Sequence, residues 1–256
     1  MKRLLVEMTW PDVAQTVADG MTTVILPLGA TEQHGPHLPL GTDTFRAEAL
    51  AERLASTLPD VLVAPALPIG CSDEHSGFAG LLSLDHATLA GVIVDCARRM
   101  AAWGVRRLVL LSAHGGNGQA LQLATVRLGD ELRELQVEVI GPSTTVSDAL
   151  LAVAEAEGVS PEALGLHAGE GETSEMLCLR PDLVRMERVV PGYPGPMEDI
   201  MPKLLEGGLR PITPTGTLGD ASRADGIRGE RYLAEQIESY RQRLTPPRDI
   251  PQCLPA

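Results

Sequence analysis

The stretch TTVILPLGATEQHGPHLPLGTDT, residues 22–44, decides the fold and much of the chemistry of this chain. Its first part, residues 22–28, is an unbroken apolar run with β-branched side chains, which is typical of a strand buried on both faces of a parallel sheet. The polar part that follows holds Glu32, His34 and Asp43 within twelve positions. Carboxylate and imidazole groups bind divalent metals, so the sequence predicts a metal site directly after this strand.

Strand and helix signals alternate along the rest of the chain. Short apolar runs between turn signals predict further strands at residues 61–67, 107–112 and 137–140. Apolar residues at helical spacing predict helices at residues 13–18, 45–56, 89–103, 119–135, 147–157, 197–206 and 230–244. Asp43 or Thr42 is expected to cap the helix at 45–56. The alternation favours an α/β fold with a mainly parallel central sheet and helices on both of its faces.

The composition is that of a soluble globular protein, with 44% hydrophobic and 21% charged residues among 256. One domain is expected over residues 1–245, followed by a Pro-rich tail at 246–256. The formal charge of −13 and the lack of clustered Lys and Arg exclude nucleic acid as an expected partner. Neither a signal peptide nor an apolar run of roughly 18 residues is present, so no membrane partner is expected. Four cysteines without CxxC spacing predict reduced thiols and a cytoplasmic location.

Polar clusters follow three of the predicted strands, and a fourth cluster occurs further along the chain. Ser72, Glu74 and His75 come after the second strand, and His114 with a Gly-Gly-Asn-Gly run comes after the third. The segment HAGEGETS, residues 167–174, forms the fourth cluster. Because the carboxyl ends of parallel strands meet at one edge of a sheet, we expect these groups to lie close to the predicted metal ligands.

These clusters allow more than one interpretation. Glu32 and His34 are two residues apart, so in extended backbone both point to one face and can hold one ion, or they make ordinary loop hydrogen bonds. His114 suits a metal ligand better than a phosphate-binding turn, because the lysine and spacing of a P-loop are absent. The segment 167–174 is as consistent with a capped helix start as with a catalytic role. No GxSxG motif supports a serine nucleophile.

Four motifs, LPLGATEQHGPHLPLGTD, SDEHSGFAGLLSL, SAHGGN and HAGEGETSEMLCLRPDLV, occur in this order. They resemble the creatininase (creatinine amidohydrolase) family, and the likeness extends to EMTWPDV near the start and to GTLGD at residues 216–220. It covers about residues 5–244. The resemblance implies a three-layer αβα sandwich, a metal-dependent hydrolase and a homo-oligomer, often a hexamer.

The resemblance also implies roles for individual residues. The glutamate of TEQHG, here Glu32, binds one metal ion, and the histidine, here His34, binds the second. Asp43 bridges the two ions, and His114 completes the first ion's ligands. His167, the histidine of HAG, serves as an acid/base or substrate-positioning group.

Two departures separate this sequence from creatininase itself. Creatininase has a glutamate ligand of its second metal two residues after the third-strand histidine, where this chain has Gly116. Glu172 is the expected substitute; otherwise the site holds a single metal ion. Creatininase also closes its pocket with tryptophans before the HAG motif, and this chain has none there. The missing tryptophans disfavour creatinine as the substrate. The HGGN sequence with the glutamate of ETS resembles other members of the family, such as formamide hydrolases and mycofactocin-type peptidases.

The expected activity is hydrolysis of an amide C–N bond in a cyclic amide, formamide or similar molecule by metal-bound hydroxide, with one or two zinc, manganese or iron ions. Glu170 or Glu172 is expected to accept the water's proton, and His167 to give one to the leaving nitrogen. One alternative is a peptidase that trims a short peptide, whose groove is shaped by the Pro- and Gly-rich residues 191–214. Another is a non-catalytic scaffold stabilised by metal. Substrate contacts are expected from Ser72, Glu74, His75, Gly115, Gly116 and Asn117.

Overall fold

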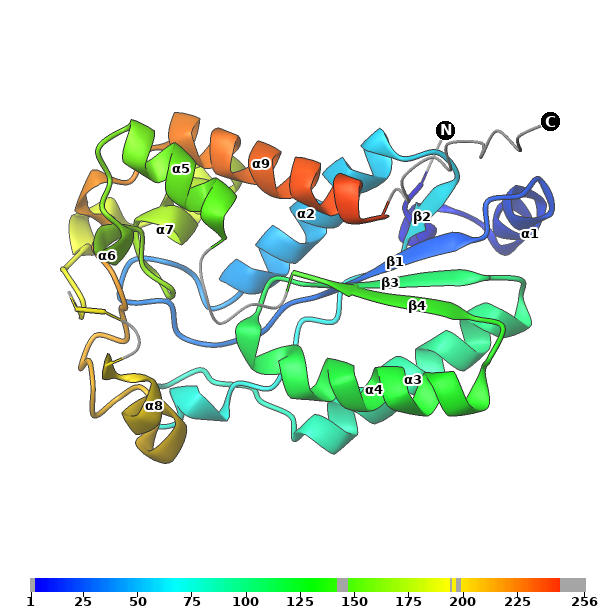
Figure 1. Ribbon diagram of the computed structural model, residues 1–256, viewed down its shortest axis with the longest axis horizontal. Helices are drawn as coiled ribbons and strands as arrows, with labels where there is room; N and C mark the ends of the chain where they lie inside the picture. The colour runs from blue at the N-terminus through cyan, green and yellow to red at the C-terminus, as the bar shows by residue number, and fades with distance from the viewer. Residues whose placement is uncertain (1–2, 142–146, 194, 197–198, 245–256) are drawn as a thin grey trace, which may run out of the picture.

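The predicted strands form one parallel sheet in the computed structural model, which describes residues 3–141, 147–193, 195–196 and 199–244. The strands are β1 (Thr23–Leu28), β2 (Val61–Val63), β3 (Arg107–Ser112) and β4 (Gln136–Ile140). Their order across the sheet is β2-β1-β3-β4 (Figure 1). Pairing runs from Thr23 with Arg107 to Leu28 with Ser112, so β1 and β3 end side by side. The loops that follow these two strands therefore begin next to each other.

Alternate side chains of β1 enter two hydrophobic cores. The helices that cover the sheet are α2 (Thr42–Thr57), α3 (His86–Ala102), α4 (Gly118–Glu131) and α9 (Gly226–Leu244). Val24, Leu26 and Leu28 pack with α3 and α4, whereas Ile25 packs with α2 and α9 on the opposite face. Burial on both faces explains why this strand is apolar throughout. The expected three-layer αβα sandwich is confirmed, and Figure 1 shows its helices on both sides of the sheet.

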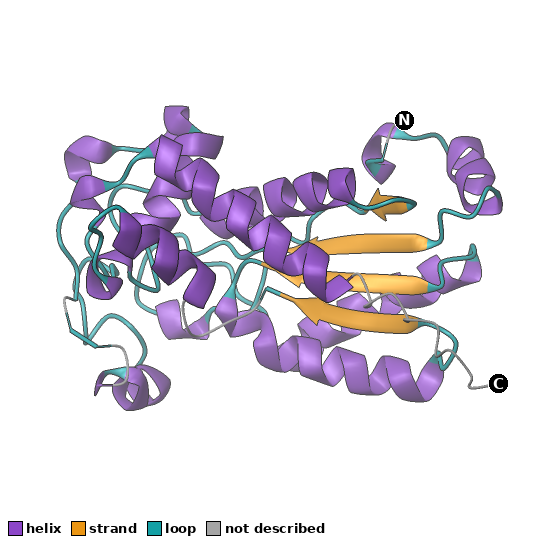
Figure 2. Ribbon diagram, turned by 45° about the horizontal axis from the view of Figure 1, so that its top comes forward, coloured by secondary structure: helices purple, strands orange, loops and turns teal. Residues whose placement is uncertain are grey.

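The remaining helices are short or lie at the ends of the sheet. They are α1 (Trp10–Ala18), α5 (Asp148–Ala156), α6 (Pro161–Leu164), α7 (Glu170–Leu179) and α8 (Met201–Gly207). Short 3₁₀ turns are η1 (Leu5–Glu7), η2 (Asp73–His75), η3 (Gly115–Asn117), η4 (Pro181–Leu183), η5 (Met186–Arg188) and η7 (Ala221–Arg223). Figures 1 and 2 show α5 to α8 gathered at the end of the molecule to which the strands point. This is the end where a site is expected in a parallel sheet.

Several element boundaries differ from the sequence-based predictions: α1 and α3 begin three residues earlier than predicted, and α4 ends four residues earlier. The second strand ends at Val63 instead of residue 67, because Pro65 has no N–H for the ladder, and only Leu67 forms a further isolated bridge. Helix α2 begins at Thr42 and has Gly41 as its cap, so Asp43 lies within the first turn, where a negative charge is favourable. Helix α9 begins at Gly226, one turn before the predicted start.

Parts of the predicted organisation lie outside the described residues. The predicted helix at 197–206 corresponds to α8, which begins at Met201 with Ile200 as its N-cap residue, and residues 197–198 of the prediction are outside the description. The expected Pro-rich tail at 246–256 is also outside it. Among the helices that the structure describes, none combines the length and the apolar character needed to cross a bilayer.

Candidate metal centre

The polar clusters that follow the strands meet at the carboxyl edge of the sheet. Glu32 and His34 lie in the loop after β1, His75 lies in η2, His114 directly follows β3, and His167 precedes α7. The rings of His34 and His167 have centroids 4.2 Å apart, and those of His75 and His167 are 4.5 Å apart. Residues separated by more than a hundred positions in the chain thus form one buried cluster, as the sequence predicted.

Asp43 stands at the centre of this cluster, between two histidines. Its Oδ1 lies 3.2 Å from His34 Nε2, and its Oδ2 lies 3.3 Å from His114 Nδ1. Two sets of possible ligand atoms, each within 4.8 Å of one another, share this aspartate: Glu32, Asp43 and His114 form one, and His34, Asp43 and Glu172 form the other. These two sets contain the residues that the resemblance assigns to the first and the second ion, and two other sets, Glu32 with His34 and His167 and Glu32 with Glu74 and His75, do not include Asp43.

The hydrogen bonding of Glu32 tests whether these residues fit a metal ion. Glu32 is completely buried, yet neither carboxylate oxygen has a well-aligned hydrogen-bond donor among the described residues, and Asp43 Oδ2 has none either. Such unpaired buried oxygens are costly unless a cation compensates them. Together with imidazole nitrogens from His34 and His114, they form a nitrogen and oxygen donor set that suits zinc, manganese or iron. The residues present therefore fit a divalent metal.

The electrostatics of the cluster favour positive charge at its centre. Burial raises the pKa of Glu32 to about 7, against the opposing effect of His114. Burial disfavours charge on His34 and His114 as well, but the nearby carboxylates outweigh it and raise their pKa values to about 9 and about 10. Burial opposes charge on Asp43 too, but the two histidines hold its pKa well below the usual range. The same carboxylates that favour histidine protons favour a bound cation.

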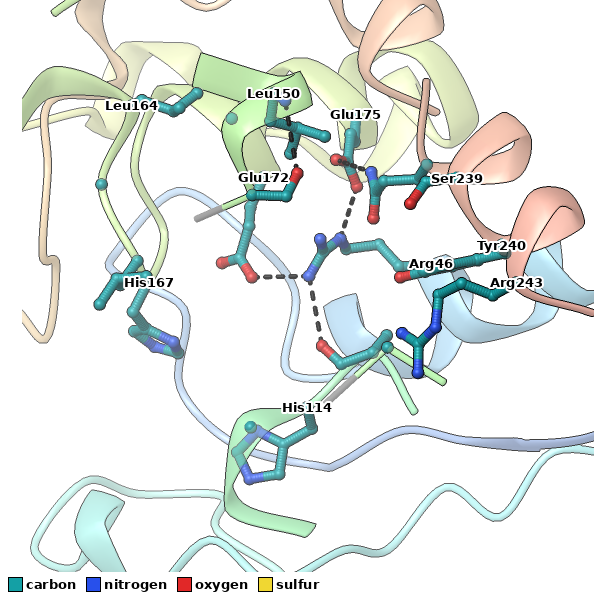
Figure 3. Close-up of a pocket in the computed structure, with 18 residues that line it drawn as sticks. Arg46, His114, Leu150, Leu164, His167, Glu172, Glu175, Ser239, Tyr240 and Arg243 are labelled. Atoms are coloured by element: carbon teal, nitrogen blue, oxygen red, sulfur yellow. Dashed lines mark hydrogen bonds and ion pairs between the residues drawn. The ribbon is translucent and has the colours of Figure 1, made fainter. Parts of the chain in front are cut away.

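Glu172 is held in place by a buried arginine. Arg46 Nη1 donates to Glu172 Oε1 at 2.6 Å and Arg46 Nε donates to Glu175 Oε2 at 2.7 Å, as Figure 3 shows. The Ala168 N–H donates to the other oxygen, Oε2, at 2.8 Å, from a backbone with φ of 52°, a strained value for a residue other than glycine. Burial opposes charge on Glu172, but Arg46 lowers its pKa. The carboxylate is thus ionised and oriented 3.7 Å from His34 Nε2.

His167 is oriented by Gln33, the residue between Glu32 and His34 in the sequence. Its Nε2 lies 2.7 Å from the backbone carbonyl oxygen of Gln33 and 3.0 Å from the side-chain amide nitrogen of Gln33. In the tautomer whose Nε2–H donates to the carbonyl, Nδ1 keeps the lone pair, 3.7 Å from Glu32 Oε1. The side-chain amide of Gln33 donates to His75 Nδ1 at 2.9 Å. Burial, assisted by the charge of His34, lowers the pKa of His167 to about 3, so the ring is neutral near pH 7.

Glu170 does not join the cluster, although the sequence suggested it as a proton acceptor. Its two oxygens accept hydrogen bonds from Ser174 Oγ and Arg228 Nε, each at 2.6 Å, and from Tyr232 OH at 2.8 Å. The side chain is completely buried between α7 and α9. The position of Glu170 therefore corrects this assignment: the carboxylate joins two helices.

Two cavities adjoin the cluster. The small cavity, about 380 Å³, lies on the side of α7 and α9 and is drawn in Figure 3; its wall includes Arg46, Glu172 and Arg243. The large cavity, about 700 Å³, lies on the side of η2 and α8, and its wall includes Glu74 and Glu206. Both volumes fall within the usual range for ligand sites. The residues that line both cavities are His114, Gly115, Leu166 and His167.

The residues expected to contact substrate divide into two groups. Glu74, His75, Gly115 and Gly116 line the large cavity. Ser72 and Asn117 line neither cavity and are completely buried. The Asn117 amide donates to the Gly29 carbonyl at 3.1 Å and its oxygen accepts from the Cys71 N–H at 2.9 Å, while Ser72 Oγ lies 3.2 Å from His114 Nε2. Ser72 and Asn117 therefore support the loops instead of contacting substrate, which corrects the expectation from the sequence.

Gly116 is the position where the sequence departs from creatininase. A Cβ at this position would clash with the carbonyl oxygen of Cys71 and with His114 Nε2. No side chain fits there without movement of the loop after β2. In the structure Glu172, from a different segment, places a carboxylate beside His34 and Asp43, and its role as the substitute ligand stays a prediction.

Three residues of this region were not predicted from the sequence. Arg46 follows Asp43 by three positions, and this helical spacing could have indicated that both face one side of α2. Gln33 was not predicted, because in an extended segment its side chain would point away from the face shared by Glu32 and His34. His86, the first residue of α3, lines the large cavity although it follows no strand.

Comparison with known proteins agrees with this geometry. Residues 6–244 match the family model described as creatininase, creatinine amidohydrolase. The chain is 33% identical over 244 residues to a mycofactocin precursor peptide peptidase of Mycobacterium ulcerans (92% of this chain, 85% of that protein). It is 36% identical over 244 residues to a creatinine amidohydrolase of Pseudomonas putida (89% of this chain, 90% of that protein).

Solved structures give the same result. A crystal structure of creatinine amidohydrolase superposes with a TM-score of 0.81 at 33% identity, covering 96% of this chain and 99% of that one. Other solved creatininases are described as manganese and zinc–zinc forms. The fold and these matches lead to one conclusion: the chain belongs to the creatininase family.

Proposed function

We propose that this protein is a divalent-metal-dependent hydrolase that cleaves amide C–N bonds. The observation that carries this proposal is Asp43, whose two oxygens face different histidines and belong to two sets of possible ligands. The unpaired oxygens of buried Glu32 support it, because a structural carboxylate would have hydrogen-bond donors. The family relatives, an amidohydrolase and a peptidase, both act on bonds of this class by name.

The residues of the chain suit the proton transfers of amide hydrolysis. A divalent ion at this cluster supplies a Lewis acid that activates water and polarises the scissile carbonyl. His167 lies at the wall shared by both cavities, so we assign its Nδ1 to relay the proton of the attacking water; because its pKa is low, the ring holds this proton only in passing. It then passes this proton to the leaving nitrogen as the C–N bond breaks and the hydroxyl joins the carbonyl carbon. Glu172, ionised and fixed by Arg46, is assigned to metal binding instead.

The test combines metal content with hydrolysis. Bound metals are measured by mass spectrometry, and amine release from formamides, cyclic amides and short peptides is followed before and after chelation. We expect more than one divalent ion per chain, loss of activity on chelation and recovery when zinc or manganese is returned. Amine release that persists in metal-free protein would contradict the proposal, and one ion per chain would contradict the role of Glu172.

The choice between a small amide and a peptide has a structural argument of its own. A small cyclic amide needs one enclosed pocket, whereas this cluster lies at a wall shared by cavities of about 380 and 700 Å³. A substrate that extends to both sides of the scissile bond fits this arrangement better, which favours the peptidase alternative over a small amide. The kcat/KM values of the metal-loaded protein for short peptides and for formamides, measured on the same preparation, decide between the two.

A further inference from the structure

The two cavities differ in charge. The wall of the large cavity includes the proposed metal ligand Glu32 and three further carboxylates, and no lysine or arginine is among the described residues that line it; the three are Asp73, Glu74 and Glu206. The wall of the small cavity includes two guanidinium groups, Arg46 and Arg243, and two carboxylates, Glu172 and Glu175, both of which form ion pairs with Arg46. A substrate that spans both cavities therefore meets an acidic environment on one side of the cluster and, on the other, the guanidinium of Arg243, which has no carboxylate partner among the described residues.

Only one of the two arginines has capacity left for a ligand. Arg46 is buried and committed to Glu172 and Glu175. Arg243 has no carboxylate within salt-bridge distance among the described residues, and the hydrogen bond it makes is from Nη2 to the Val139 carbonyl at 3.1 Å. A guanidinium has five N–H donors arranged as a fork that matches a carboxylate, so most of its donors remain available.

The neighbouring residue Arg241 shows how a surface arginine is otherwise satisfied. Two residues away on α9, Arg241 donates to both oxygens of Glu238, at 2.8 and 2.7 Å, and does not line the small cavity. Figure 3 shows Arg243 and His167 on opposite sides of the small cavity, with Arg46 and Glu172 between them. A group bound at Arg243 is thus separated from the proton-transferring residue by the length of this cavity.

From this arrangement we infer that Arg243 binds the C-terminal carboxylate of a short peptide substrate, whose last residues occupy the small cavity. The part of the peptide on the amino side of the scissile bond then occupies the large acidic cavity, which favours neutral or basic residues. The inference rests on the proposed amide hydrolysis and adds which end of the peptide is released. The enzyme releases a short C-terminal fragment: the hydroxyl of water joins the carbonyl carbon in the large cavity, and the freed amine belongs to the fragment beside Arg243.

An acidic side chain presents the same carboxylate as a C-terminus, so the test separates the two sources. A mixture of octapeptides of varied sequence is prepared with free C-terminal carboxylates and again with C-terminal carboxamides, and each set contains members with and without Asp or Glu. Metal-loaded protein is incubated with each set, and mass spectrometry gives the cleaved bonds and their kcat/KM values. Wild type, Arg243→Gln and the matched control Arg241→Gln are compared.

We expect wild type to cut near the C-terminus of the free acids and to lose about 10–100-fold in kcat/KM on the carboxamides, as for the loss of a charge-assisted hydrogen bond. Arg243→Gln should lower kcat/KM for the free acids by a similar factor, mainly through KM, and leave the carboxamides unchanged. Arg241→Gln should behave as wild type. If Arg243 only stabilises the end of α9, both arginine variants will retain the wild-type preference, and that result overturns the inference.

Other outcomes separate this inference from the proposed function. Equal cleavage of both peptide sets overturns the carboxylate site while amide hydrolysis stands. A preference that follows Asp or Glu instead of the C-terminus also overturns it, because the carboxylate then comes from a side chain. Hydrolysis of formamides or cyclic amides without cleavage of any octapeptide overturns it as well. If metal-loaded protein hydrolyses none of these compounds, the proposed function fails together with the inference.

Discussion

Two completely buried glutamates, Glu32 and Glu170, differ in how their charge is accommodated. Glu170 accepts three hydrogen bonds, from a serine, an arginine and a tyrosine of α7 and α9. Glu32 has ring nitrogens of His75 and His114 at 3.1 and 3.3 Å from its two oxygens, yet neither is aligned as a hydrogen-bond donor. The protein itself donates hydrogen bonds to the Glu170 carboxylate, whereas the Glu32 carboxylate has no aligned donor among the described residues.

This difference shows which buried charges stabilise the fold and which serve chemistry. A buried carboxylate without donors costs free energy, so it persists only where a ligand compensates it. A buried carboxylate with a complete set of donors holds its helices together, and its removal disturbs packing more than catalysis. The predictions below test this division, ordered by the size of their expected effect on catalysis.

The largest effect is expected from Asp43→Asn, which keeps the shape of the side chain but weakens both sets of ligands at once. We expect loss of bound metal and a decrease of at least about 1,000-fold in kcat/KM, because several kcal/mol of electrostatic stabilisation are lost. Mass spectrometry of bound metal and the hydrolysis assay measure both effects. Asp95→Asn, on the exposed face of α3, is the matched control and should retain both. Full metal content in Asp43→Asn would remove this residue from the centre of the site.

A smaller effect is expected from His167→Ala. The variant should keep its metal, because Glu32, His34, Asp43 and His114 are unchanged, and should lose about 100- to 10,000-fold in kcat through the missing proton transfer. Metal content and kcat are measured on the same preparation. Loss of metal together with kcat would instead make His167 a ligand, which its position within 4.8 Å of Glu32 and His34 also permits.

Arg46 should affect catalysis indirectly, through metal affinity. In Arg46→Leu, Glu172 loses the donor that orients it, and we expect metal to bind about 10–100-fold more weakly, as for other partners of metal ligands. Metal dissociation constants from competition with a chromogenic chelator give this number, and activity at saturating metal should largely recover.

A control is needed for the buried charge of Glu175, which Arg46→Leu leaves without its ion-pair partner. Arg46→Leu also deprives the buried Glu175 of its partner, which destabilises the fold by itself. The double variant Arg46→Leu/Glu175→Leu removes both charges and should regain stability while metal binding stays weak. Recovery of normal metal affinity in the double variant would show that Arg46 acts through packing alone.

The sequence predicted the fold well where burial is complete, and the site well where ligands follow strands. The strands β1 and β3 were located to within one residue, because apolar runs buried on both faces have few alternatives. Asp43 and His114 lie close together, as expected, because the carboxyl ends of parallel strands converge, and their roles as metal ligands stay a prediction.

The sequence did not reveal which side chains of a helix point toward the cluster. Glu170 and Glu172 both lie in the segment 167–174, and as loop residues they were equally suited to catalysis. Because α7 begins at Glu170, the two side chains are about 200° apart around the helix, and only Glu172 faces the cluster. Likewise, the contact of Arg46 with Glu175 depends on the packing of α2 against α7, which no local pattern specifies.

The smallest effect on catalysis is expected from Glu170→Gln, although its effect on stability should be large. Arg228 is buried beside Glu170 and would keep only its ion pair with Glu157, so we expect a loss of about 3 kcal/mol in the free energy of unfolding. Metal content and kcat of the folded protein should be unchanged. Urea unfolding, measured with metal content and kcat on the same samples, checks these values.

The isosteric variant Glu32→Gln completes this test, because it applies the same chemical change to the carboxylate that has no aligned donor among the described residues. In metal-free protein it removes a buried charge that has no donor, so the free energy of unfolding should rise instead of falling. With metal present the order reverses, because wild type gains the free energy of metal binding and the variant does not. Loss of stability in metal-free Glu32→Gln would mean that the protein itself satisfies this carboxylate, and the distinction between the two glutamates would no longer hold.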